Sequence, residues 1–157
     1  MASLDRFLKA QEDSYSRALR EIQSGQKKSH WMWYIFPQLK GLGRSETALY
    51  YGIKDLKEAQ EYTKNKVLWM RLLEITQALL EIDTSDPTAV FGSPDDKKLR
   101  SSMTLFLSIS GDTIFQKVLD KFYHGEMDPV TLRMIKEQKK DLNKKKCDYV
   151  VTYGSSS

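Results

Sequence analysis

Apolar residues recur at intervals of three and four along much of the chain, which is the period of an amphipathic helix. Over residues 4–22 this spacing places one apolar stripe along a helix, which Gly25 can end. The same period predicts helices over 55–65 and 66–82, and another over 112–125. The pattern of hydrophobic and polar positions therefore favours helices over strands.

Three further helix starts share one local signal, an aspartate or serine followed by proline. The side-chain oxygen can accept a hydrogen bond from a free amide of the first turn, and proline fits the first helical position because no donor is needed there. The pairs are Asp86–Pro87, Ser93–Pro94 and Asp128–Pro129. Each predicts the beginning of a helix.

The stretch Tyr149–Tyr153 is rich in strand-forming residues, but the sequence offers it no partner strand. The predicted helices are short and must pack on one another, because short helices are marginal alone. Glycine and proline interrupt them at uneven intervals. The sequence therefore predicts an all-α fold, a single domain of about seven or eight short crossed helices in an orthogonal array rather than a regular bundle.

The chain has 157 residues, of which 40% are hydrophobic and 29% charged, and it can bury one core of its own. No stretch approaches the length of about 20 apolar residues that a membrane-spanning helix needs, and the charged N-terminal segment lacks the apolar centre of a signal peptide. We therefore expect a cytoplasmic protein, with a nuclear location left open. The single cysteine, Cys147, excludes an intrachain disulfide and a cysteine-based zinc cluster.

Most of the formal net charge of +4 lies near the C-terminus. Six lysines against three acidic residues give 136–148 a local net charge of +3, so the first 135 residues carry only +1. We expect an all-helical domain over 1–135 and a lysine-rich C-terminal extension over 136–157, partly flexible. The nearly neutral domain offers no basic face for nucleic acid, so such binding would use the extension. No membrane partner is expected, and the oligomeric state is left open.

The segment 27–37 is the most unusual part of the sequence. It holds two of the three tryptophans, Trp31 and Trp33, and one of the two histidines, His30, within four positions. An indole can stack on a flat ring, and an imidazole can transfer a proton near neutral pH. The segment is therefore a candidate binding wall with His30 as acid or base. The alternative is that these aromatic residues only fill the core.

The turn 41–47 leads into a short predicted helix and offers groups that bind anions. Its glycines allow a close backbone approach, and free amides at a helix start favour negative charge. Arg44 and Ser45 are therefore candidate ligand-binding residues, although an ordinary capped turn explains them as well. No strand precedes the turn, which excludes a dinucleotide site of the Rossmann type.

The helix start within 93–104 carries a third group of candidates. Asp95 could act as a catalytic carboxylate alongside His30, although an acid in a first helical turn also complements the helix dipole. Hydroxyl and guanidinium groups follow where a buried helix would favour apolar residues, and they could contact a sugar or phosphate. These candidates are Arg100, Ser101 and Ser102. No metal site or cofactor is expected, because the two histidines are far apart and no acidic residue stands at ligand spacing from either.

Several of these motifs together resemble a family of small uncharacterised helical proteins, domain of unknown function 1810, some of whose members carry the label calpastatin. The matching runs are Ser29–Gln38, Gly41–Gly43, Phe91–Asp96, Leu99–Phe106 and Asp128–Leu132. The resemblance covers about residues 3–135 and implies an all-helical fold without implying a reaction. The sequence departs from the family at Asn65–Lys66, where a His-Pro pair is expected, and in the lysine-rich extension. Calpain inhibition has little physical support. An inhibitor that folds on its target is a polar, disordered chain when free, whereas this sequence predicts a globular domain.

A shorter similarity, over Leu42–Ser45 and Lys121–Phe122, is to proteins that act on ADP-ribose-type compounds. Our leading hypothesis is a pocket, formed by the aromatic segment, the Arg44 turn and the later helix start, that binds a nucleotide-like small molecule and could hydrolyse it. The alternative is a non-enzymatic module that binds a protein or peptide through an exposed aromatic loop, since tryptophan and tyrosine are enriched at interface hot spots. Whether the protein is an enzyme is left open.

Overall fold

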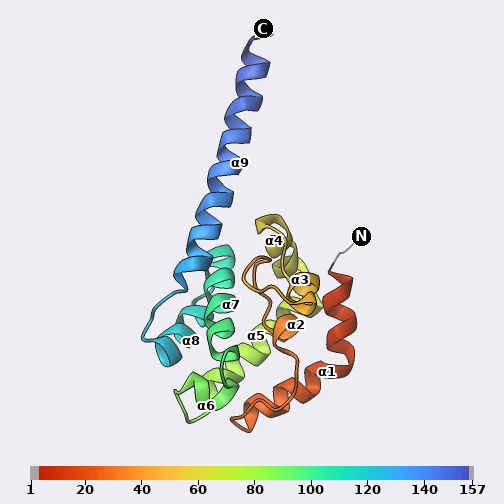
Figure 1. Ribbon diagram of the computed structural model, residues 1–157, viewed down its shortest axis with the longest axis vertical. Coiled ribbons are helices and arrows are strands. Elements are labelled where there is room, and N and C mark those ends of the chain that lie inside the picture. The colour runs from red at the N-terminus through yellow and green to blue at the C-terminus, as the bar shows by residue number, and fades with distance from the viewer. Residues whose placement is uncertain (1–3, 156–157) are drawn as a thin grey trace.

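The computed structural model describes residues 4–155, with side chains described for 4–144 (Figure 1). The described residues form nine helices and no strand. They are α1 (Asp5–Gln23), α2 (Met32–Ile35), α3 (Glu46–Tyr51), α4 (Leu56–Lys64), α5 (Lys66–Glu81), α6 (Pro87–Phe91), α7 (Asp95–Ser110), α8 (Thr113–Tyr123) and α9 (Pro129–Ser155). The predicted all-α fold is confirmed, with slightly more helices than the pattern indicated.

The helices cross one another at different angles around a shared core (Figure 1). Helix α5 packs against α1, α4 and α8, and α7 packs against α4, α6, α8 and α9. Aromatic and aliphatic side chains fill the space between them, and apolar burial of this kind is the main term that favours folding. The largest fully buried side chains include Trp31, Tyr62, Phe7, Phe36, Phe106 and Phe115.

Aspartate caps begin several of the helices as the sequence predicts. Side-chain oxygens of Asp55, Asp86, Asp112 and Asp128 each accept a hydrogen bond from an amide in the first turn of α4, α6, α8 and α9. The cap predicted at Ser93 is wrong. Helix α7 begins at Asp95, with Pro94 in the cap position and no side-chain cap bond. The Gly92 carbonyl instead accepts the Asp96 amide at 2.9 Å, so backbone closes this turn.

The strand-forming stretch Tyr149–Tyr153 is helical in the structure and belongs to α9. A strand without a partner leaves its amides and carbonyls unpaired, whereas a continuing helix pairs them within itself. Helix α9 runs from the domain into the lysine-rich extension and projects away from the other helices (Figure 1). Residues 156–157, where flexibility was also expected, lie outside the described residues.

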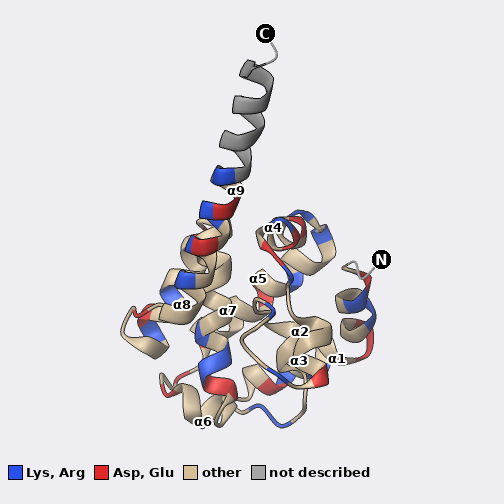
Figure 2. Ribbon diagram, turned by 45° about the horizontal axis from the view of Figure 1, so that its top comes forward, with Lys and Arg blue, Asp and Glu red and all other residues tan. Residues whose placement is uncertain are grey.

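Positively and negatively charged residues are intermixed along the chain, as the ribbon of Figure 2 shows for α1, α4 and the described part of α9. This mixing agrees with the nearly neutral charge of the first 135 residues. Within the described part of the chain, no helix combines the length and the apolar character needed to cross a membrane.

The connection between α2 and α4 is held in place by backbone pairing and by α1. The Ile53 amide donates to the Gln38 carbonyl at 2.8 Å, and the Lys40 amide donates to the Ile53 carbonyl at 2.7 Å. Arg6 of α1 donates to the carbonyls of Tyr50 and Gly52 at 2.8 and 3.0 Å. These bonds fix the segment that carries Gln38 and the Gly41–Ser45 turn beside the start of α7.

Candidate functional site

Two neighbouring cavities lie where the segment 27–47 meets the start of α7. The first, the Lys27 pocket, has a volume of about 330 Å³ and is lined by Lys27, His30, Trp33, Ser45, Asp95 and Lys98, among others. The second, the Gln38 pocket, has a volume of about 280 Å³ and is lined by Trp33, Gln38, Gly43, Lys97, Lys98 and Ser101, among others. Two side chains, Trp33 and Lys98, line both pockets.

Asp95 organises the charges of the Lys27 pocket. One carboxylate oxygen lies 2.8 Å from Lys27 Nζ, and the other lies 2.9 Å from Lys98 Nζ. Burial raises the pKa of Asp95, but the hydrogen bonds and positive charges of Lys27 and Lys98 outweigh it and hold that pKa below its usual value. Asp95 is therefore ionised at neutral pH, and these three groups together carry one net positive charge.

Trp33, on the one-turn helix α2, is partly buried and lines both pockets. Lys98 Nζ lies 4.5 Å from the centre of an indole ring, within the range of a cation–π contact. On the Gly43 side, a Cβ added to that glycine would lie 2.6 Å from Trp33 Cη2 and 2.8 Å from Ala48 Cβ. The indole position therefore requires a glycine at residue 43.

Replacing Gly43 with alanine, which adds this Cβ as a methyl group, tests the contact with Trp33. We expect Gly43→Ala to lower the free energy of unfolding by about 1 to 3 kcal/mol, because the indole must shift within a packed site. The loss should be smaller in a Trp33→Leu background, where a shorter side chain leaves room for the methyl. Urea denaturation of the four proteins measures both values, and an equal loss in both backgrounds would contradict the proposed clash.

Trp31 has a different position from Trp33, although only one residue separates them. It is 1% exposed and packs against Phe36 and Phe91. Its Nε1 donates to Glu21 at 2.9 Å. The stacking role expected for Trp31 is therefore not available in this conformation, since the ring belongs to the core.

Glu21, near the end of α1, holds the segment that leads to Trp31. Its carboxylate accepts hydrogen bonds from the Lys28 and Ser29 amides at 2.7 and 2.9 Å, and from the Ser29 hydroxyl at 2.6 Å. Burial raises the pKa of Glu21, but these bonds and the one from Trp31 lower it to about 2. Glu21 was not among the site residues predicted from the sequence. Its one signal is an acid in the last turn of a helix, which the helix dipole disfavours.

The other predicted site residues are divided between the pockets and the rest of the domain. His30 is exposed and lines the Lys27 pocket, as does Ser45, whose hydroxyl oxygen caps α3 by accepting from the Ala48 amide at 3.1 Å. Ser101 lines the Gln38 pocket. Arg44 is exposed but is not part of either lining.

Arg100 and Ser102 also lie outside the two linings. An Arg100 Nη2 to Asp128 Oδ1 distance of 3.6 Å directs the guanidinium toward the start of α9. Ser102 is fully buried in α7. In the described residues no group of three or more histidine, cysteine, aspartate or glutamate side chains is placed to hold a metal ion.

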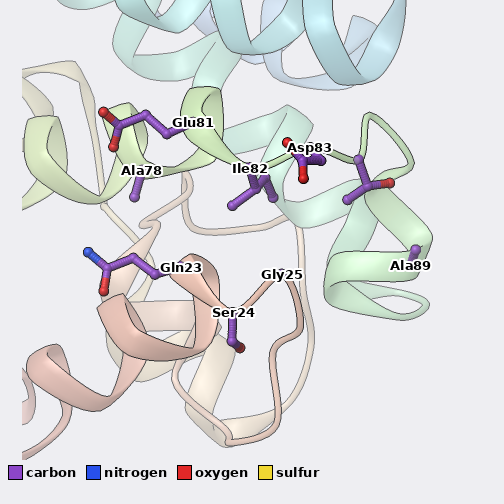
Figure 3. Close-up of a pocket in the computed structure, with 9 residues that line it drawn as sticks. Gln23, Ser24, Gly25, Ala78, Glu81, Ile82, Asp83 and Ala89 are labelled. Atoms are coloured by element: carbon purple, nitrogen blue, oxygen red, sulfur yellow. The ribbon is translucent and has the colours of Figure 1, made fainter.

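A third cavity, of about 540 Å³, lies elsewhere, between the ends of α1 and α5 and near α6 (Figure 3). Gln23, Glu81 and Asp83 are among the side chains around it. Its lining contains no aromatic ring and no positively charged group, so it lacks the means to hold an anionic ring compound. The chemistry that the sequence singled out is in the two pockets around Trp33.

Comparison with known proteins places this site in a family. Residues 1–135 match the family described as "Protein of unknown function (DUF1810)". The chain belongs to the DUF1810 family. The residues that line the two pockets fall within the DUF1810 region, and the lysine-rich extension, 136–157, lies beyond it.

A solved structure supports the fold. The chain is similar to the crystal structure of the conserved hypothetical protein Rv1873 from Mycobacterium tuberculosis, with 41% sequence identity and a TM-score of 0.82. The match covers 84% of this chain and 95% of that chain. No curated protein matches the chain.

Proposed function

We propose that the protein binds a small anionic ligand with a flat ring, a nucleotide-like compound, in the Lys27 pocket. The observation that carries this proposal is one cavity that combines two ammonium groups, a single carboxylate and a partly exposed indole. Small-molecule sites combine an apolar surface with a few convergent polar groups, and this cavity has both.

The positive charge supports an anionic group on the ligand. Each lysine ammonium has three donors, and Asp95 accepts from one donor of Lys27 and one of Lys98. The side chain of Lys27 is 8% exposed, so a ligand phosphate beside it would interact in a site screened from water. The hydroxyl-bearing residues Ser45 and Thr47 complete the polar lining.

The indole of Trp33 supports the proposal that the ligand carries a flat ring. Stacking of a base on an aromatic side chain contributes about 1 to 3 kcal/mol and tolerates different bases. Lys98 already contacts the ring, so a bound anion would draw this ammonium toward itself. A ligand with a flat ring and an anionic group would thus contact Trp33 and Lys98 at the same time.

The charges in the pocket support binding more than they support hydrolysis. The pKa of Asp95 lies below its usual value, because two ammonium groups stabilise the carboxylate more than burial destabilises it. Such a carboxylate does not donate a proton at neutral pH, so it is unsuited to act as a general acid. In our proposal Asp95 positions Lys27 and Lys98, and His30 at the rim is left as the proton-transfer group.

The alternative function, protein binding through an exposed aromatic loop, has less support. Of the aromatic residues in 31–36, Trp31 and Phe36 are buried at 1% and 0% exposure, and Trp33 and Tyr34 are partly buried. An interface anchored by aromatic side chains needs them accessible to the partner.

A ligand panel tests the proposal. We expect AMP, ADP or ADP-ribose to raise the melting temperature, and adenosine and inorganic phosphate, each with only one of the two features, to do so far less. Lys98→Met should weaken the binding of the best nucleotide by about tenfold or more, because it removes an ammonium beside the ring. Lys117→Met, on the exposed face of α8, is the matched control. Equal affinity in both variants, or no response of the wild-type protein to any nucleotide, would reject the proposal.

A further inference from the structure

We infer that the ligand has two ends, one in the Lys27 pocket and one in the Gln38 pocket, joined by a phosphate-containing link at Lys98. This inference rests on the proposed function and adds the substrate class, a pyrophosphate-linked compound of dinucleotide type rather than a mononucleotide. It depends on the common border of the two pockets and on an unpaired group in the second one.

The two pockets are arranged to be filled together. They have similar volumes, about 330 and 280 Å³, and both are bordered by Trp33 and Lys98. Lys98 Nζ lies 2.9 Å from Asp95 and 4.5 Å from the indole ring centre, so its charge is held at this border. An anionic link between two bulky ends would place its charge beside that ammonium, with one end in each pocket.

Gln38 gives the second pocket a means of recognition. The residue is 2% exposed and lines the pocket, and its amide nitrogen Nε2 has no hydrogen-bond partner among the described residues. Backbone pairing with Ile53 fixes the segment from which it extends. Buried polar groups are nearly always hydrogen-bonded, and an exception calls for an explanation. A ligand oxygen or ring nitrogen that accepts from this amide would provide the missing partner.

The remaining lining of the Gln38 pocket suits the polar end of such a ligand. Ser101, Lys97 and Asp128 contribute a hydroxyl, an ammonium and a carboxylate. Apolar surface comes from Leu42, Pro94 and Val130. A sugar or a carboxamide-bearing ring has both an apolar face and acceptor oxygens. Inorganic phosphate or a mononucleotide placed in the Lys27 pocket would leave this lining, including the Gln38 amide, without a partner.

Calorimetric titration of the full chain with ADP, ADP-ribose and NAD⁺ tests the inference. We expect at least one of the two-ended compounds to bind about tenfold or more tightly than ADP. Gln38→Met, which removes the unpaired donor at similar volume, should erase that advantage and leave ADP affinity unchanged. Gln60→Met, exposed on α4, should change neither value.

The outcomes separate the inference from the proposed function. If ADP binds and neither two-ended compound binds more tightly, the inference is wrong and the proposed function stands. If no compound binds, both are wrong. Should Gln38→Met fail to fold, Lys97→Met on the exposed rim of the same pocket replaces it. That variant should weaken only the two-ended compounds, and an equal effect on ADP would overturn the inference.

Discussion

Replacing Glu58 with leucine should lower the free energy of unfolding by about 3 to 5 kcal/mol, because the substitution removes the counter-charge of a buried guanidinium. Glu58 and Arg6 form a two-point ion pair, with Nη2 to Oε1 at 2.8 Å and Nη1 to Oε2 at 3.2 Å. Both side chains are 5% exposed. The expected loss is a large fraction of the total stability of about 5 to 15 kcal/mol that is typical of a domain.

The ion pair also supports the backbone beneath the site. Arg6 donates to the carbonyls of Tyr50 and Gly52, and Glu58 Oε1 accepts from the Lys54 amide at 3.1 Å. Loss of Glu58 therefore affects the connection between α3 and α4 as well as the ion pair itself. Urea denaturation followed by circular dichroism measures the effect.

Two further variants identify the cause. Glu61→Leu, an exposed position on the same helix, should change stability by less than about 0.5 kcal/mol. The double variant Arg6→Met with Glu58→Leu should lose less stability than the sum of the losses of the two single variants, because the same ion pair is removed in each of them. Losses that simply add would show that the ion pair between the two residues is not the source of the effect.

Glu21→Gln should also lower the free energy of unfolding, by about 2 kcal/mol at neutral pH. The pKa of Glu21 in the folded protein is about 2, against an ordinary value of 4.5, because four hydrogen bonds favour the carboxylate more than burial opposes it. A lowered pKa stabilises the fold above the unfolded value. This contribution is lost as the pH falls from about 4.5 to about 2.

The pH profile therefore distinguishes this explanation from simple loss of packing. The difference in stability between the wild-type protein and Glu21→Gln should shrink steadily between pH 4.5 and pH 2. Glu12→Gln, exposed on the same helix, should follow the wild-type curve. A difference that stays constant over that pH range would mean that ionisation of Glu21 does not hold the 28–31 segment.

The helices could be predicted because their signals are local. The apolar period marks α1, α4, α5 and α8, and an aspartate before proline marks α6 and α9. Ser93 failed as a cap because a backbone carbonyl, from Gly92, took the amide it would have bound. A competition of this kind depends on the path of the chain, which the residues at the helix start do not reveal.

The candidate site could be predicted only in part. The sequence indicates that the aromatic segment, the glycine turn and the start of α7 meet, and residues from all three line the pockets. It could not decide which indole is accessible, because Trp31 and Trp33 differ only in how a one-turn helix is packed. Gln38 was missed for a similar reason, since a glutamine carries no sign of an unpaired buried amide until its neighbours are placed.

Helix α9 has a practical consequence for the experiments above. It runs without interruption for 20 residues past the end of the DUF1810 region, a distance of about 30 Å at 1.5 Å per residue. A biotin or dye coupled near its last turn would therefore keep a sensor surface well away from the Lys27 and Gln38 pockets. Immobilisation by that end leaves the face with these two pockets open to solution.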